Sequence, residues 1–184
     1  MRGKKSTPHP DPDDPPRRRA NKRPGHGTYE TDRPPIFTLV GRSSGTVRYF
    51  VRHHTDTATC QEVVESSVPP GAAILYTDEW QGYRSVGAAL AIGHATVRHS
   101  PDESGRREWA RDDDGDGIRE VHCNSCEGAT TGLRTYLRGF RGVHKKYLAL
   151  YVATYETMRQ AKQISSQVIQ RMCFNPQPPH SDHT

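Results

Sequence analysis

The chain has 184 residues, of which 32% are hydrophobic and 26% are charged, and its formal net charge is +5. This length suits one domain with tails, and the modest apolar share indicates that part of the chain lies outside a hydrophobic core. No run of about 18 apolar residues occurs, so no transmembrane helix is expected. The basic N-terminus also lacks the apolar segment of a secretory signal.

The positive net charge favours an anionic partner, most often nucleic acid, although a surface that only keeps the protein soluble explains it equally well. Because no secretory signal is found, we expect the cysteines to be reduced thiols in a cytoplasm. These cysteines are Cys60, Cys123, Cys126 and Cys173.

Residues 1–33 are rich in proline and charged side chains and show no apolar periodicity. The prolines exclude a helix or a central strand, so we expect a flexible basic arm. The cations of this arm either contact a DNA backbone or form a solvated tail. They are Arg17, Arg18, Arg19, Lys22 and Arg23.

Regular structure is expected over residues 34–163, as one domain. The β-branched and aromatic runs 36–40 and 47–51, separated by the turn-forming residues 43–45, predict a β-hairpin. Thr59 with Glu62 has the spacing of a capping box and predicts a helix. Its apolar face carries Cys60, Val63, Val64 and Val68.

The middle of the chain predicts further strands and helices in alternation. The apolar run 72–76 follows the helix-ending residues 69–71 and precedes a helical pattern at 80–90, so it predicts a strand buried on both faces. Residues 94–100 predict another strand, and the highly charged residues 101–121 predict a surface insertion. This order predicts an α/β fold around a mixed sheet.

Two helices are expected in the last third of the chain, at 124–140 and 144–163. The second has an apolar stripe at helical spacing, made by Leu148, Tyr151, Val152 and Tyr155. Residues 164–184 are expected to form a disordered tail.

Asp78 is the most informative carboxylate in the sequence. It directly follows a predicted buried strand, and α/β sheets place their ligand sites at the carboxyl ends of strands. An aspartate that only caps the following helix fits the same position, so position alone leaves both interpretations open.

Asn124 and Glu127 lie three residues apart near a predicted helix start and therefore share a helix face. Both side chains offer oxygen ligands for a hard divalent cation. Helix capping by the asparagine and dipole matching by the glutamate explain the same residues without a metal.

A basic face is predicted on the same helix and at the start of the next one. It fits a track of contacts to DNA phosphates, and equally a solvated cationic face. Its residues are Arg134, Arg138, Arg141, Lys145 and Lys146.

Two further patterns resemble metal sites but are incomplete. Cys123 and Cys126 have the spacing of half a zinc site, yet no second pair of ligands follows at a suitable distance. Residues 112–117 match the first half of a calcium loop, but its twelfth position is Cys123 rather than glutamate, so we interpret this run as an acidic surface loop.

Three motifs follow one another in order along the chain, with an acidic insertion at residues 107–117. They are Tyr76-Thr-Asp78-Glu79-Trp80-Gln-Gly-Tyr83, His122-Cys-Asn124-Ser-Cys-Glu127-Gly128 and Leu133-Arg134. Together they resemble the ISXO-like transposases of the insertion-sequence family fifteen ninety-five. The resemblance covers residues 8–160.

The resemblance implies a ribonuclease-H-like fold in which a mixed sheet is flanked by helices, and a DDE-type site whose third acidic position is often asparagine. By this resemblance Asp78 is the second catalytic position, and Asn124 or Glu127 supplies the next metal ligand. Arg134 matches a position usually held by a basic residue. Two divalent ions, Mg²⁺ or Mn²⁺, would bridge the scissile phosphate.

The resemblance also implies partners and a location. The implied partner is double-stranded DNA, both the transposon ends and the target. The intact transposase is expected to be a homo-oligomer in the bacterial cytoplasm, associated with the nucleoid. No membrane association is implied.

One feature of the family pattern is not found. The first catalytic aspartate belongs to an Asp-Glu pair on the first strand, and residues 1–8 already resemble the loop that follows it. We therefore expect that the given sequence starts after the first catalytic aspartate of the family. We also expect a sheet that lacks its first central strand and a chain that is inactive alone. The alternative is a transposase remnant that only binds DNA or inhibits an intact copy.

Overall fold

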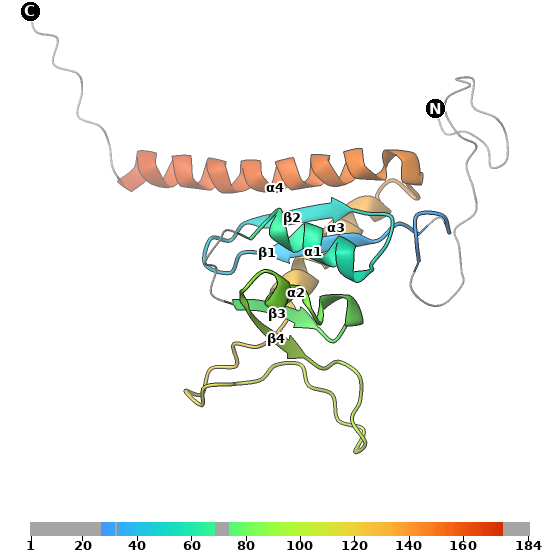
Figure 1. Ribbon diagram of the computed structural model, residues 1–184. Coiled ribbons are helices and arrows are strands. Elements are labelled where there is room, and N and C mark those ends of the chain that lie inside the picture. Colours follow the sequence, from blue (N-terminus) through green and yellow to red (C-terminus); the bar gives the residue numbers. More distant parts are fainter. Residues whose placement is uncertain (1–26, 32, 69–73, 175–184) are drawn as a thin grey trace, which may run out of the picture.

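The computed structural model of the protein describes residues 27–31, 33–68 and 74–174. Most of the predicted basic arm and the predicted helix-ending residues 69–71 lie outside these ranges. The described residues form a mixed α/β structure of two small sheets and several helices (Figure 1).

The predicted β-hairpin is confirmed as strands β1 (Ile36–Val40) and β2 (Val47–Val51). The strands are antiparallel, and Ile36 pairs with Val51 at the open end. The turn closes where the Gly41 amide donates to the Thr46 carbonyl at 2.9 Å. Gly45 has a φ of 69°, a left-handed conformation in which a side chain would be strained.

The helix predicted after the hairpin is α1 (Thr57–Glu65), and its buried face carries Cys60, Val63 and Val64 as expected. The predicted capping residue was wrong. Asp56 is the N-cap, and its carboxylate accepts a hydrogen bond from the Thr59 amide at 2.8 Å. Aspartate caps at least as well as threonine, so the helix begins earlier.

Strand β3 (Ile74–Asp78) pairs in parallel with β4 (Gly93–Val97). The prediction that β3 is buried on both faces was wrong. Ile74 is 51% exposed, and Thr77 is the only buried residue of β3. The helix predicted at 80–90 is broken into a 3-10 turn, η1 (Gln81–Tyr83), and a short helix, α2 (Val86–Ala89).

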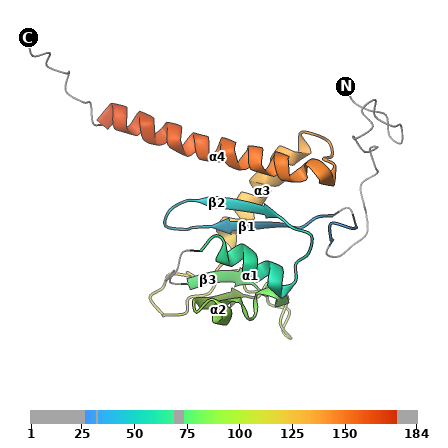
Figure 2. The same cartoon turned by 45° about the horizontal axis from the view of Figure 1, so that its top comes forward.

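The single mixed sheet that was predicted is not formed by the described residues. They form two sheets of two strands each, ordered β1-β2 and β3-β4. The edge of β1 opposite β2 and the edge of β3 opposite β4 have no strand partner within the described part of the chain. Figure 2 shows the hairpin above the β3–β4 pair, with β1 on the side toward β3 and α1 alongside.

The long helices at the C-terminal side are α3 (Asn124–Arg138) and α4 (Lys145–Phe174). The second continues past its predicted end at residue 163, so residues 164–174 are helical rather than part of a tail. In both views α4 runs along the hairpin on the side away from β3 and β4 (Figures 1 and 2). No helix of the described residues is long and apolar enough to cross a membrane.

Two apolar clusters hold these layers together, and β1 contributes to both. One cluster joins the hairpin to α3 and α4 through Val47, Tyr49, Ala129, Leu133, Leu148 and Val152. The other joins the hairpin to α1 and α2 through Phe37, Cys60, Val63, Val64 and Val86. Alternate side chains of β1 point to opposite faces, so this strand is the wall between the two clusters.

Candidate functional site

Asp78 lies at the carboxyl end of β3, as predicted, and its side chain is exposed. One carboxylate oxygen accepts a hydrogen bond from the Trp80 amide at 3.1 Å, so Asp78 also stabilises the turn that follows the strand. Neighbouring Glu79 accepts hydrogen bonds from the backbone amide and the hydroxyl of Ser100. These bonds tie the end of β3 to the segment that leaves β4, and the Ser100 hydroxyl lowers the pKa of Glu79.

Asn124 and Glu127 are exposed in the first turn of α3. The carboxylate of Glu127 lies 3.7 Å from the imidazole of His99, which follows β4. No side chain caps this end of α3.

Arg42 is a residue at the centre of this region that the sequence did not indicate. Its guanidinium donates hydrogen bonds to the backbone carbonyls of Glu120 and His122. It also stacks over the Tyr76 ring, 4.2 Å from the ring centroid. Arg42 thereby connects the hairpin turn, β3 and the segment that enters α3.

The end of β3 and the start of α3 approach each other around two cysteines. Burial, together with the negative charges of Asp78 and Glu127, raises the pKa of the Cys123 thiol to about 12. Burial also raises the pKa of Cys126, to which the same two carboxylates contribute. The charges of Asp78 and Glu127 therefore act on one small region.

Asp78 and Glu127 do not form a complete set of metal ligands with a third such side chain of the described residues. Among the described residues, the only three Asp, Glu, His or Cys side chains whose ligand atoms all lie within 4.8 Å of one another are Asp112, Asp114 and Asp116. Asp78 and Glu127 both act on the same two cysteines without belonging to such a group, and Asn124 lies in the same first turn of α3 as Glu127.

The raised thiol pKa values lead to a direct prediction. We expect Cys123 in the folded protein to react with iodoacetamide much more slowly at pH 7.5 than in urea, because only the thiolate reacts. The rate should continue to rise with pH above 9, the ordinary thiol value, since the pKa of Cys123 is about 12. Mass spectrometry of the labelled peptides measures this rate, and a plateau near pH 9 in the folded protein would contradict the assignment.

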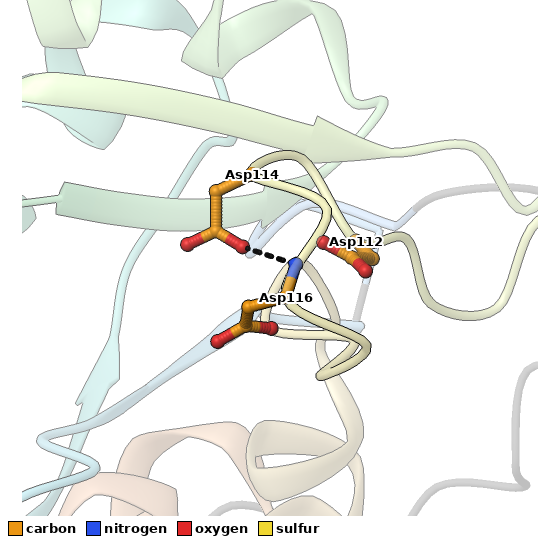
Figure 3. A group of neighbouring side chains, drawn as sticks. All are labelled: Asp112, Asp114 and Asp116. Carbon is orange, nitrogen blue, oxygen red and sulfur yellow. Dashed lines mark hydrogen bonds between the residues drawn. The ribbon is translucent and has the colours of Figure 1, made fainter.

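The acidic insertion forms an exposed loop between β4 and α3, as predicted. Figure 3 shows the carboxylates of Asp112, Asp114 and Asp116 gathered on one side of this loop. Asp112 accepts hydrogen bonds from the Gly115 and Gly117 amides, which lower its pKa. The carboxylates thus stabilise the loop itself, and Cys123 at the twelfth position does not complete a calcium-binding loop.

The predicted basic face is partly assembled. Arg134 and Arg138 are exposed and line a shallow groove of about 360 Å³, together with Leu137 and Val143. Lys146 is also exposed. Lys145 instead donates a hydrogen bond to the Tyr29 carbonyl at 2.7 Å, so it anchors the N-terminal segment.

Arg141 lies in the connection between α3 and α4 with a φ of 55°. The predicted DNA contacts at 17–19 and 22–23 lie outside the described residues.

Comparisons of the sequence with known proteins identify its family. The chain belongs to the family of ISXO2-like transposase domains, whose family model matches residues 10–157, well over half of the sequence. It is also similar to an uncharacterized protein in the transposable element ISH50 of Halobacterium salinarum, with 26% identity over 149 residues. That match covers 80% of this chain and 46% of the relative, so the chain spans about half the length of the relative.

Proposed function

We propose that this chain is the catalytic region of a DNA transposase that cleaves and joins the ends of an insertion sequence by two-metal chemistry. The family match over residues 10–157 carries this proposal. The charges of Asp78, at the end of β3, and of Glu127, at the start of α3, act on the same two cysteines, which supports it. Partners and activity are proposed for the intact protein, since the chain spans 46% of its relative.

The donor atoms in this region fit Mg²⁺ or Mn²⁺, which prefer oxygen ligands. Asp78 and Glu127 supply carboxylate oxygens, and Asn124 supplies an amide oxygen. When bound, a pair of such ions activates the attacking hydroxyl and stabilises the leaving oxygen. Arg134 and Arg138, one helical turn apart on α3, are placed to hold the DNA backbone, and exposed Lys146 extends the same basic surface.

We further propose that the full site belongs to a ribonuclease-H-like fold with one more strand. A single strand inserted between the open edges of β1 and β3 would join the two observed sheets into one mixed sheet. It would also place its own side chains next to Asp78, where the resemblance implies the first catalytic aspartate. We therefore propose that the chain binds DNA but does not cut it alone, which agrees with a DNA-binding or inhibitory role for the isolated chain.

The experiment is to measure binding and cleavage of duplex DNA that carries the ends of the chain's own element. We expect binding that weakens steeply between 50 and 200 mM salt (roughly 10³-fold for about six phosphate contacts), because each contact releases counterions. We expect no cleavage with Mg²⁺ or Mn²⁺. Absence of DNA binding would overturn the proposed function, and metal-dependent cleavage would overturn the proposed inactivity.

The metal ligands can be tested separately from activity. We expect Mn²⁺ to broaden backbone amide NMR signals around Asp78 and Asn124, because its paramagnetism acts on nearby nuclei. Asp78→Asn should abolish this broadening, whereas Glu103→Gln, which removes an exposed carboxylate elsewhere, should not. Signals of the loop at 112–116 report any Mn²⁺ held there. Broadening around Asn124 that survives Asp78→Asn would exclude Asp78 as a ligand.

A further inference from the structure

A second polar feature lies beside Asn124, away from the basic groove of α3. It is a cavity of about 500 Å³ between the hairpin turn, the start of α3 and α4. Its polar lining includes Arg42, His122, Asn124, Ser125 and Arg159, and it contains no carboxylate.

Arg159 is the feature of this cavity that most needs a partner. Its Nε atom is buried and has no hydrogen-bond partner among the described residues. The carboxylate one turn earlier on α4, that of Glu156, already binds Arg48 at 2.9 Å and accepts the Tyr49 amide at 2.9 Å. A buried donor without an acceptor costs about 1–3 kcal/mol, and more when the group is charged.

The other walls of the cavity are also electropositive. Arg42 contributes a second guanidinium to the lining. The N-terminus of α3, which no side chain caps, opens at Asn124 and Ser125 on the cavity wall. Free amides and the helix dipole favour an anion at such a position.

We propose that this cavity binds a phosphate group. A tetrahedral anion at this place satisfies the Nε donor of Arg159 and is attracted by Arg42 and by the amides of the first turn of α3. The origin of this phosphate group rests on the function proposed above. In a transposase, the group is a phosphodiester of bound DNA. The cavity then holds the DNA backbone next to Asn124, one of the proposed metal ligands.

Gly128 offers a way to close the cavity without disturbing its charges. It lines the cavity from α3, and a Cβ atom added there meets no other atom within 4 Å. A larger side chain at this position therefore extends into open space, and the helix gains a better helix former than glycine.

The test compares Arg159→Gln and Gly128→Leu with the control Lys162→Gln, which removes an exposed cation from the same helix. The first probe is inorganic phosphate, titrated at constant ionic strength against the melting temperature. We expect both cavity variants to bind phosphate at least fivefold more weakly than the original protein and the control. Phosphate also stabilises proteins generally by exclusion, so only the difference between variants is informative.

The second probe is a duplex DNA, with affinity measured over a salt series. We expect Arg159→Gln to weaken binding about tenfold and to reduce the slope of log affinity against log salt by about one. Arg159→Lys, which keeps the charge, should restore most of the slope. Phosphate binding without an effect on DNA would assign the cavity to free phosphate.

The outcomes separate this inference from the proposed function. If the chain binds DNA and both cavity variants behave like Lys162→Gln with both probes, the cavity proposal is wrong and the proposed function stands. If the chain binds no DNA but its phosphate affinity falls in both cavity variants, the proposed function is wrong and the cavity remains a phosphate site.

Discussion

Leu133→Ala should lower the free energy of unfolding by about 3 kcal/mol, since large-to-small changes at buried leucines cost about 2–5 kcal/mol. Leu133 is only 2% exposed and lies on α3, where it packs with Val47 and Tyr49 of the hairpin and Val152 of α4. Its side chain is therefore shared by three elements that no backbone ladder joins. Urea denaturation followed by the helical circular-dichroism signal measures the loss.

Two neighbouring changes make this result interpretable. Thr131→Ala, on the exposed side of the same helix, should change stability by less than about 0.5 kcal/mol. Leu133→Met, which nearly conserves the volume, should cost less than about 1.5 kcal/mol. Equal effects of Leu133→Ala and Thr131→Ala would mean that α3 does not pack on the hairpin in this way.

Local patterns were sufficient for the elements whose residues make contacts close in sequence. The hairpin was predictable because the strand runs 36–40 and 47–51 flank a tight turn. The helices α1, α3 and α4 were predictable because their apolar residues recur at helical spacing. Their boundaries were less certain, because a cap such as Asp56 or a long helix such as α4 depends on single residues or on distant support.

The errors concentrate where contacts are distant in sequence. The helical pattern at 80–90 gives way to η1 and α2 because the Trp80 indole donates to the Thr55 carbonyl at 2.9 Å, which fixes the chain in a turn. The burial of β3 depends on what pairs with its outer edge. Within the described residues nothing does, so its apolar residues are more exposed than their pattern indicated.

The same reason divides the candidate site. Asp78, Asn124 and Glu127 were predictable from strand-end and helix-start positions and from motif order. Arg42 and Arg159 were not, because their importance comes from Glu120, His122 and a cavity formed by three separate elements. A basic side chain carries no signal in the sequence that distinguishes such a position from an ordinary solvated one.

Gly82→Ala should lower the free energy of unfolding by about 3 kcal/mol, the upper part of the range for overpacked interiors. Gly82 is buried in η1, and an added Cβ would lie 2.7 Å from the Cys60 sulfur, 2.8 Å from the Thr55 carbonyl and 2.9 Å from the Trp80 indole nitrogen. The carbonyl and the indole are hydrogen-bonded to each other, so neither can move without breaking that bond. Thermal unfolding should show a fall in the midpoint of roughly 10 °C for a chain of this size.

Gly128→Ala is the matched control, because its Cβ meets no atom within 4 Å. It should raise stability by up to about 1 kcal/mol, the difference in helix propensity between glycine and alanine. If Gly82→Ala left the midpoint unchanged or raised it, the close approach of η1 to α1 would be wrong. If Gly82→Ala destabilises the protein as expected, close packing explains why a glycine stands at this position of the motif at residues 76–83. Only a residue without a side chain lets the turn after Asp78 pack on α1, and that packing holds Trp80, whose amide positions the Asp78 carboxylate.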